Sequence, residues 1–287
     1  MHRLPRILAS ALIAALPAFG LTVGLSTAAN ASSVDTAAGP ASAGPEASAI
    51  AVIRSLEVGQ HGNFQSLPGA SHFSGQGQVE STNWSGYADT GSNFSTVTGS
   101  WTEPAASCSR STTYAAFWVG IDGYSSDTVE QDGTLIECYE RTAYQYSWWE
   151  MYPTNDIQLV GESVAAGDSV SASVVRSGDS YTLSVTDSTH SANSFTTTQT
   201  CSDCDNSSAE WVAEAPCCTN SGGILPLADF GSWTESGATV TEGSTSGVIS
   251  SFTDDEITMV DSAGRVKAQP SALSTGNSFS DTWERSS

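Results

Sequence analysis

The feature that most constrains the fold is a repeated two-residue alternation of apolar and polar side chains. Tyr181, Leu183 and Val185 alternate with hydroxyl residues, and residues 170–174 repeat the pattern with serines between the apolar positions. Glycine and aspartate separate such segments, and no stretch keeps a helical period. Short strands with these turns are typical of a two-sheet β-sandwich. The same reasoning predicts strands at 93–101, 114–121, 144–152, 157–163, 194–200, 209–214, 256–260 and 277–283.

The first 31 residues have the features of a secretory signal peptide. Arg3 and Arg6 precede an apolar run, and the small residues Ala29-Asn30-Ala31 follow it. We expect cleavage after Ala31 and export of a secreted, extracellular protein. The apolar run is short and is followed by a cleavage site, which argues against a membrane anchor.

The next segment, residues 32–78, is rich in Ala, Ser, Gly and Pro. It can bury little apolar surface to offset its ordering entropy, so we expect a propeptide or a disordered arm. Residues 79–287 remain as one folded domain, long enough to bury a core. We expect this domain to be a monomer.

The folded domain is strongly acidic, with 28 Asp and Glu against six Lys and Arg from residue 79 onward. Such a surface repels nucleic acid and anionic membranes at neutral pH, so neither is an expected partner. Acid usually unfolds proteins as positive charge accumulates. A domain with few bases gains little positive charge, and we therefore expect it to work in acid.

Six cysteines in an exported chain favour disulfides, with fifteen pairings open. We expect Cys108 to pair with Cys138, which leaves a cluster of the remaining four: Cys201, Cys204, Cys217 and Cys218. A zinc site formed by that cluster is the alternative, but it fits an oxidising compartment poorly. We predict no metal and no other cofactor.

Several classes of hydrolase are disfavoured by what the domain lacks. Its only histidine, His190, lies in a polar stretch, and no Gly-x-Ser-x-Gly elbow accompanies it. The His-Glu-x-x-His zinc signature is absent, as is a strand-flanked Asp-Thr-Gly or Asp-Ser-Gly. A thiol nucleophile would need a free cysteine with a basic partner. Hydrolysis by carboxyl and carboxamide groups remains.

A set of short motifs resembles the glutamic peptidases, or eqolisins, of a secreted, bacterial type. The motifs cover most of residues 80–284 in the order of that family: Asn-Trp-Ser-Gly-Tyr at 83–87, Val-Thr-Gly-Ser-Trp-Thr-Glu-Pro at 97–104, Phe-Trp-Val-Gly-Ile-Asp-Gly at 117–123, Glu-Gln-Asp-Gly at 130–133, Trp-Trp-Glu-Met-Tyr-Pro at 148–153, Gly-Asp at 167–168, Ala-Glu-Trp at 209–211 and Leu-Ala-Asp-Phe-Gly at 227–231.

The resemblance implies a lectin-like or jelly-roll-like sandwich of two antiparallel sheets, each of about seven strands, that hydrolyses proteins and peptides in acid and is insensitive to pepstatin. It implies a catalytic dyad of Gln131 and Glu210. Glu210 would act as general base and acid for a water molecule, and the Gln131 amide would donate to the oxyanion. The other family positions around the site are the groove-lining Trp118 and Tyr152 and the supporting carboxyl groups Asp122 and Glu150.

One departure from the family and two other functions complete the prediction. Tyr146 stands where some relatives have an acidic residue, so part of the carboxyl network is expected to be missing. A lectin-like sandwich that binds polysaccharide is one alternative function. A glycosidase that uses Glu130 or Glu150 with Glu210 is the other.

Overall fold

The computed structural model describes residues 63–66, 77–217 and 223–287, and these residues form β-strands with two short 3₁₀ turns. The first eight strands are β1 (Gly77–Ser81), β2 (Trp84–Thr90), β3 (Phe94–Thr102), β4 (Thr113–Ile121), β5 (Val129–Tyr139), β6 (Thr142–Tyr152), β7 (Asn155–Ser163) and β8 (Ser169–Ser177). The remaining elements are β9 (Ser180–Asp187), η1 (Ser191–Asn193), β10 (Phe195–Thr200), β11 (Ser208–Glu214), β12 (Ser232–Glu242), β13 (Thr245–Gly247), η2 (Ile249–Ser251), β14 (Thr253–Val260), β15 (Val266–Pro270) and β16 (Phe279–Trp283).

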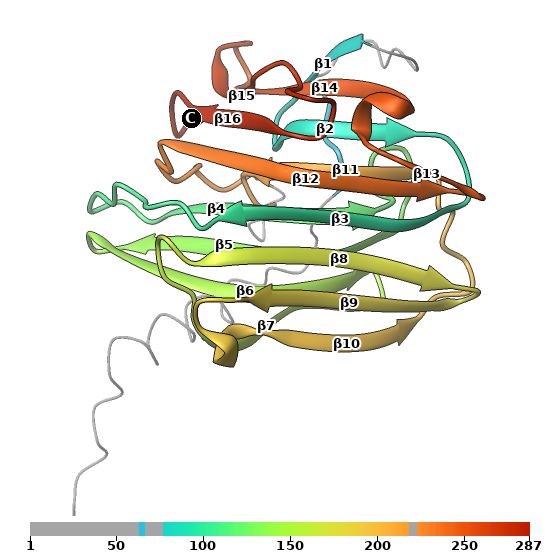
Figure 1. Cartoon of the computed structure of the whole chain (residues 1–287). Coiled ribbons are helices and arrows are strands. Elements are labelled where there is room, and N and C mark those ends of the chain that lie inside the picture. Colours follow the sequence, from blue (N-terminus) through green and yellow to red (C-terminus); the bar gives the residue numbers. More distant parts are fainter. Residues whose placement is uncertain (1–62, 67–76, 218–222) are drawn as a thin grey trace, which may run out of the picture. The chain divides into compact units, whose positions relative to one another are not determined.

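The strands form two packed layers, as expected for a β-sandwich (Figure 1). They are joined in a single hydrogen-bonded path with the order β10-β9-β8-β3-β12-β16-β15-β14-β2-β11-β4-β5-β6-β7. The layers are therefore not two separate sheets of seven strands. β12 joins the two layers, because its first residues pair with β16 and its later residues pair with β3. Among the paired strands of the described residues, only β1 and β14 run parallel.

The main core lies between the layers. Phe117, Val119 and Trp211 point into it from one layer, and Val97 and Leu183 belong to the same cluster from the other. A second apolar cluster contains Trp84, Trp118, Trp148 and Val212. Because successive side chains of a strand point to opposite faces, the two clusters lie on opposite faces of the layer that contains β2, β11, β4, β5 and β6. This layer is buried on both faces.

Several strands were not predicted, among them β1, β2, β13 and β15. β12 was missed, and so was β5, whose Glu-Gln-Asp-Gly sequence has the composition of a turn. Burial explains β5: its residues are fully buried from Val129 to Cys138, and its backbone pairs with β4 and β6 along its length. The chain turns a corner after β4, where Asp122 and Gly123 have φ angles of 70° and 98°.

The predicted disulfide between Cys108 and Cys138 is confirmed, with Cα atoms 5.2 Å apart. Cys201 pairs with Cys204, and Cys217 is also disulfide-bonded, whereas Cys218 lies outside the described residues. Oxidised cysteines rule against the alternative zinc site at Cys201 and Cys204.

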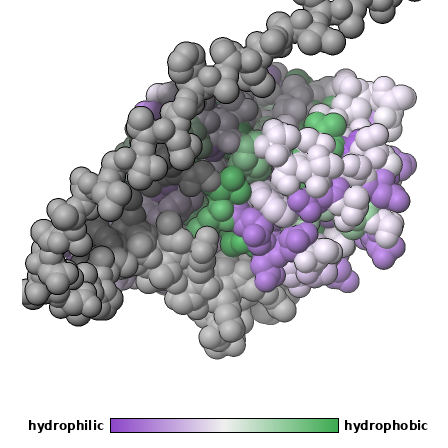
Figure 2. Space-filling model, turned by 90° about the horizontal axis from the view of Figure 1, so that it is seen from below, coloured by the Kyte–Doolittle hydropathy of each residue, from purple (hydrophilic) through white to green (hydrophobic). Residues whose placement is uncertain are grey.

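Seen from below, the described surface is mostly near-neutral or hydrophilic, with a band of hydrophobic atoms near the centre of the view and smaller hydrophobic spots apart from it (Figure 2). Within the described residues there is no helix of the length and apolar character that a membrane crossing requires.

Candidate active site

The strand register brings the two predicted dyad residues into one row across the layer. Glu210 of β11 pairs with Gly120 of β4, Gly120 pairs with Gln131 of β5, and Gln131 pairs with Glu150 of β6. Directly opposed residues of antiparallel strands point to the same face. Glu210, Gln131 and Glu150 therefore project from the same face, which is the face that carries Trp118.

Gly120 stands between Glu210 and Gln131 in this row, and the interval across it is called the gap. Adjacent strands lie about 4.8 Å apart, so one intervening strand puts the two backbones roughly 10 Å from each other. A side chain at position 120 would project into this interval. A Cβ atom there would lie 2.8 Å from the Trp118 ring and 3.3 Å from Gln131 Cβ. A glycine at this position therefore leaves room for the Trp118 ring in the gap and leaves Gln131 undisturbed.

Replacing Gly120 by alanine is expected to lower kcat/KM about tenfold or more, because Gln131 or Trp118 must shift. The same crowding should reduce the free energy of unfolding by about 1–3 kcal/mol. Thermal melting and peptide hydrolysis measured on the same preparation separate the two effects. If turnover per folded molecule were unchanged, the gap at Gly120 would have no part in the chemistry.

The Gln131 carboxamide is held by Glu150. Gln131 Nε2 donates to Glu150 Oε2 at 2.6 Å, and both side chains are fully buried. Gln131 Oε1 has no hydrogen-bond partner among the described residues. Burial raises the pKa of Glu150 well above its usual value, and the Gln131 amide opposes that shift. Glu150 thus fixes one amide N–H and leaves the second N–H and the oxygen available to a ligand.

Replacing Glu150 by alanine is expected to lower kcat roughly tenfold to a hundredfold with a small change in KM, because the Gln131 amide loses its orientation. Glu150→Gln keeps a hydrogen-bonding group in place and should lose less. Steady-state kinetics on one peptide substrate checks both variants. A larger loss for glutamine than for alanine would contradict this role.

Glu210 is fully buried, and neither of its carboxyl oxygens has a hydrogen-bond partner within the described part of the chain. Burial raises the pKa of Glu210 well above its usual value. The nearby Ser208 hydroxyl lowers the pKa of Glu210, although it forms no hydrogen bond in this structure. The charges of Asp122 and Glu130 raise this pKa further. An unsatisfied buried carboxyl group such as this one is poised to bind a polar ligand such as water.

Trp118 is fixed by Glu214, a residue that the sequence reasoning missed. Trp118 Nε1 donates to Glu214 Oε2 at 2.9 Å, and Asn83 Nδ2 donates to Glu214 Oε1 at 3.4 Å. Burial raises the pKa of Glu214 to about 8. The two-residue period of β11 was the available signal, because it places Glu210, Val212 and Glu214 on one face.

The other two predicted residues lie at the end of the site. Asp122 does not contact the dyad through a hydrogen bond: its carboxylate accepts from Asn206 N at 2.7 Å and from Ser207 N at 2.8 Å. It therefore anchors the chain that leads into β11. Tyr152 is half-buried at the end of β6 and pairs with Val129. By strand alternation it lies on the same face as Glu150.

The structure does not bring Glu130 together with Glu210 on one face. Glu130 immediately precedes Gln131 in β5, so its side chain points to the opposite face, between the layers. Its Oε1 lies 2.8 Å from Cys204 Sγ. The glycosidase alternative that uses Glu130 with Glu210 loses its support.

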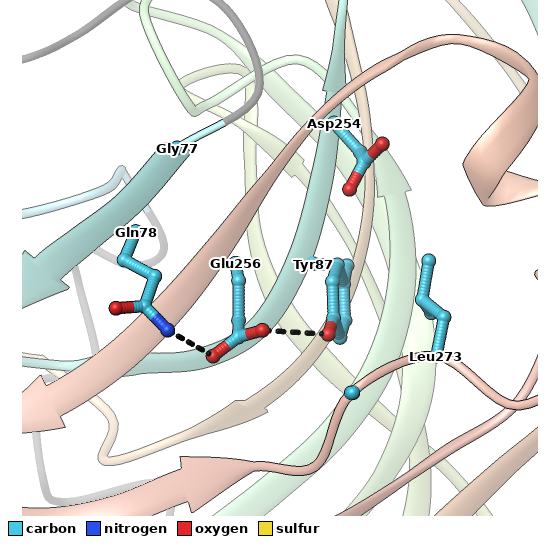
Figure 3. Close-up of a pocket in the computed structure, with 7 residues that line it drawn as sticks. Gly77, Gln78, Tyr87, Asp254, Glu256 and Leu273 are labelled. Atoms are coloured by element: carbon cyan, nitrogen blue, oxygen red, sulfur yellow. Dashed lines mark hydrogen bonds between the residues drawn. The ribbon is translucent and has the colours of Figure 1, made fainter.

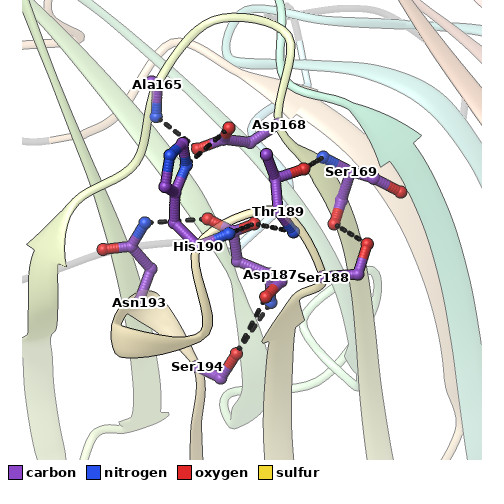
Figure 4. A network of polar contacts seen from close by, with 9 residues as sticks. All are labelled: Ala165, Asp168, Ser169, Asp187, Ser188, Thr189, His190, Asn193 and Ser194. Atoms are coloured by element: carbon purple, nitrogen blue, oxygen red, sulfur yellow. Dashed lines mark hydrogen bonds and ion pairs between the residues drawn. The ribbon is translucent and has the colours of Figure 1, made fainter.

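His190 belongs to a separate polar network at the β8–β9 end (Figure 4). Its Nδ1 lies 2.8 Å from Asp168 Oδ1, which raises the pKa of His190, and its ring is exposed. Asp187 Oδ1 accepts the backbone N–H groups of Thr189 and His190. These carboxylates are already occupied by donors from the turn, and within the described residues no hydroxyl group is hydrogen-bonded to the His190 ring. The network therefore stabilises the turn.

A pocket of about 480 Å³ lies away from the dyad, beside β1 and β14 (Figure 3). Glu256 in this pocket accepts hydrogen bonds from the Tyr87 hydroxyl at 3.0 Å and from Gln78 Nε2 at 3.2 Å. Asp254 and Leu273 complete its wall. Tyr87 points away from the face of Glu210, because it is next to Ala88, the residue that pairs with Glu210.

Comparison with known proteins gives a consistent family and fold. The profile of the Peptidase A4 family matches residues 82–282. Aspergillopepsin-2 of Aspergillus niger is 28% identical over 187 residues, which are 57% of this chain and 65% of the relative. Scytalidopepsin B of Scytalidium lignicola is 37% identical over 102 residues, 35% of this chain and 37% of the relative. The chain thus spans less than two thirds of the length of both curated relatives.

A solved structure shares the fold. It is the crystal structure of scytalido-glutamic peptidase with a transition state analog inhibitor, which superposes with a TM-score of 0.61 at 21% identity. The match covers 71% of this chain and 98% of that one. At this level of identity, the similarity shows the β-sandwich fold alone.

Proposed function

The chain belongs to the Peptidase A4 family, and from this premise we propose that it is an acid-active endopeptidase that hydrolyses protein and peptide substrates with Gln131 and Glu210. The observation that carries the proposal is the row formed by Glu210, Gly120, Gln131 and Glu150. It places one unpartnered carboxyl group and one oriented carboxamide on either side of a gap.

In the proposed reaction, a water molecule in the gap attacks the carbonyl carbon of the scissile peptide bond. Glu210, as carboxylate, takes the proton of that water and then gives it to the leaving nitrogen. The free N–H of Gln131 donates to the oxyanion that forms on the carbonyl oxygen. A carboxamide keeps this donor at any pH, because it does not titrate.

The raised pKa of Glu210 has two consequences for this reaction. It makes the carboxylate a stronger base and the carboxylic acid a ready proton donor to nitrogen, but it lowers the ionised fraction in acid. Hydrogen bonds from bound water favour the ionised form. The substrate-bound gap is therefore the state in which Glu210 can act as base.

We also propose the setting in which the enzyme works. The sequence features of residues 1–31 support secretion, and the composition of residues 32–78 supports a propeptide ahead of a catalytic domain at 79–287. The acidic balance of the chain, with a net charge of −22, supports a protein substrate in preference to nucleic acid or membrane. A single sandwich with a buried core supports a monomer.

Incubation with denatured casein at pH 3, with and without pepstatin, tests the proposed function. We expect cleavage that pepstatin does not inhibit, with internal fragments identified by mass spectrometry. The same spectra give the first residue of the enzyme, which tests the expected processing. Absence of cleavage between pH 2 and pH 5, or full inhibition by pepstatin, would contradict a glutamic peptidase.

A further inference from the structure

Residues 63–66 form a short segment that is bound through its main chain next to the dyad. Phe64 N donates to Gly123 O at 2.9 Å, and Gln65 O accepts from Thr82 N at 2.7 Å. Ser66 forms an antiparallel bridge with Ser81. Contacts of this kind do not depend on the side chains of the segment, so they would hold any extended peptide.

Asn83 strengthens this main-chain recognition. Its Oδ1 accepts from Gln65 N at 3.0 Å and its Nδ2 donates to Asn63 O at 3.3 Å, and its side chain is fully buried. The carboxamide thus satisfies an N–H and a C=O two residues apart, as a neighbouring strand would. Asn83 also donates to Glu214, which accepts from Trp118. The Asn83 contacts with residues 63–66, called the clamp below, are therefore connected to Trp118 beside the gap.

The Phe64 side chain fills an aromatic recess beside that clamp. Its ring centroid lies 4.8 Å from that of Tyr124 and 5.9 Å from that of Trp84. Trp84 in turn lies 4.9 Å, edge to face, from Trp118, which flanks Gly120. Such ring pairs are favourable beyond the area that they bury.

The recess is built onto the dyad row. The Tyr124 hydroxyl donates to Asp255 Oδ2 at 2.7 Å, and Asp255 pairs with Ala88, which pairs with Glu210. The left-handed corner at Asp122 and Gly123 turns the chain so that Tyr124 can reach across the layer to β14. Tyr124 therefore joins the loop after β4 to the same row of residues as Glu210.

We infer that Asn83 and the Trp84–Tyr124 recess form a subsite for an extended peptide with an aromatic side chain, which residues 63–66 occupy as an internal ligand. The inference rests on the proposed function, because it names the substrate class of that site. An uncharged segment suits this subsite, because Asn83 donates to Glu214 and Tyr124 donates to Asp255, and a further carboxylate beside these acidic groups would be disfavoured. The subsite accounts for the recognition of both the main chain and one side chain.

Peptide binding to the full chain tests the inference without any need for turnover. The full chain carries Phe64→Pro and Gln65→Pro, which remove the ring and two main-chain donors of the internal segment, and Glu210→Gln to prevent cleavage. The probes are acetylated, amidated Asn-Phe-Gln-Ser and its analogues with Tyr, Ala or Lys in place of Phe, titrated at pH 4 by calorimetry. We expect the Phe and Tyr peptides to bind at least about tenfold more tightly than the Ala and Lys peptides.

Three further variants in the same background separate the parts of the subsite. Tyr124→Leu should remove most of the preference for Phe over Ala, whereas Tyr124→Phe, which keeps the ring, should retain it. Asn83→Ala should weaken all four peptides to a similar degree. Melting curves establish that each variant is folded.

Equal binding of the Phe and Ala peptides, or no binding of either one, would overturn the inference. A Tyr124→Leu chain that kept the full preference would overturn the assignment of the recess. The proposed function fails by a different result, namely the absence of casein cleavage by the unsubstituted chain. The two failures are therefore distinguishable.

Discussion

Glu210→Gln is expected to lower kcat at pH 3–4 by about 10³-fold or more, with the chain still folded. A carboxamide cannot accept the proton of the attacking water, and general base catalysis of this kind contributes roughly 10²–10⁴-fold. The substitution keeps the size of the side chain and removes a buried ionisable group whose pKa is raised. The melting temperature at pH 7 should therefore stay the same or increase.

Asp132→Asn is the matched control for this variant. Asp132 is adjacent to Gln131 in β5, is fully buried, and has a pKa that burial raises well above its usual value. Its side chain points to the opposite face, away from Gly120. Hydrolysis of one fluorogenic peptide by both variants is the measurement. Similar losses in the two variants, or wild-type turnover by Glu210→Gln, would contradict the role of Glu210.

The second large effect concerns stability, which is expected to decrease as the pH increases from about 4 to about 9. The cause is a set of buried carboxyl groups for which desolvation raises the pKa. The pKa is raised to about 7 for Glu103, Glu137 and Asp281, to about 8 for Glu214 and to about 9 for Asp89. Among the described residues, only two ion pairs are formed, and neither involves any of these groups.

The direction of this pH dependence of stability follows from the number of protons that each state binds. In the unfolded chain these carboxyl groups ionise near their usual values of 3.8 and 4.5, whereas in the folded chain they hold their protons to higher pH. Between the two values the folded state binds more protons, so stability is greatest below pH 4 and is lost as the pH increases through the folded values. Each pH unit costs about 1.4 kcal/mol per group. Since domains are stable by about 5–15 kcal/mol, a few such groups lower the free energy of unfolding of this one by a large fraction near neutrality.

Melting curves from pH 3 to pH 8 check this expectation. We expect the melting temperature to decrease by about 20 °C or more between pH 4 and pH 8. Asp89→Asn should increase it at pH 8 and leave it nearly unchanged at pH 4, because neither Asp89 oxygen has a partner within the described residues. Asp261→Asn, at an exposed ion pair where the pKa is lowered, is the control and should not give this gain. A melting temperature that is flat or increases from pH 4 to pH 8 would contradict the account.

The strands that carry the clearest alternation could be predicted from the sequence, and β5 could not. In β8 and β9 one face is polar, so the period is visible, and the predicted strands agree with the observed ones. β5 is buried on both faces, and its polar residues Glu130, Gln131 and Asp132 have the composition of a turn. Local propensity was overridden there by pairing with β4 and β6, a tertiary effect that no local pattern contains.

The resemblance to the glutamic peptidases predicted the dyad. The groups around the dyad could not all be predicted, because their positions depend on strand register and on a loop that folds back. Glu214 could have been found from the period of β11. Asn83, Tyr124 and Phe64 could not, because their meeting depends on the corner at Asp122 and on the path of residues 63–66 across the layer. Contacts between segments so distant in sequence are set by the packing of the whole layer.

The most direct test of the central claim, that Gln131 and Glu210 act as one catalytic unit, is kcat/KM at pH 3.5 for the unsubstituted chain, Gln131→Ala, Glu210→Gln and the double variant on a single peptide. Residues that act as a unit give losses that do not add. The account predicts a loss of about 10³-fold or more for each single variant, with a double variant no slower than the slower single one. A single variant that kept a tenth of the activity, or a double variant whose loss was the product of the two, would contradict it.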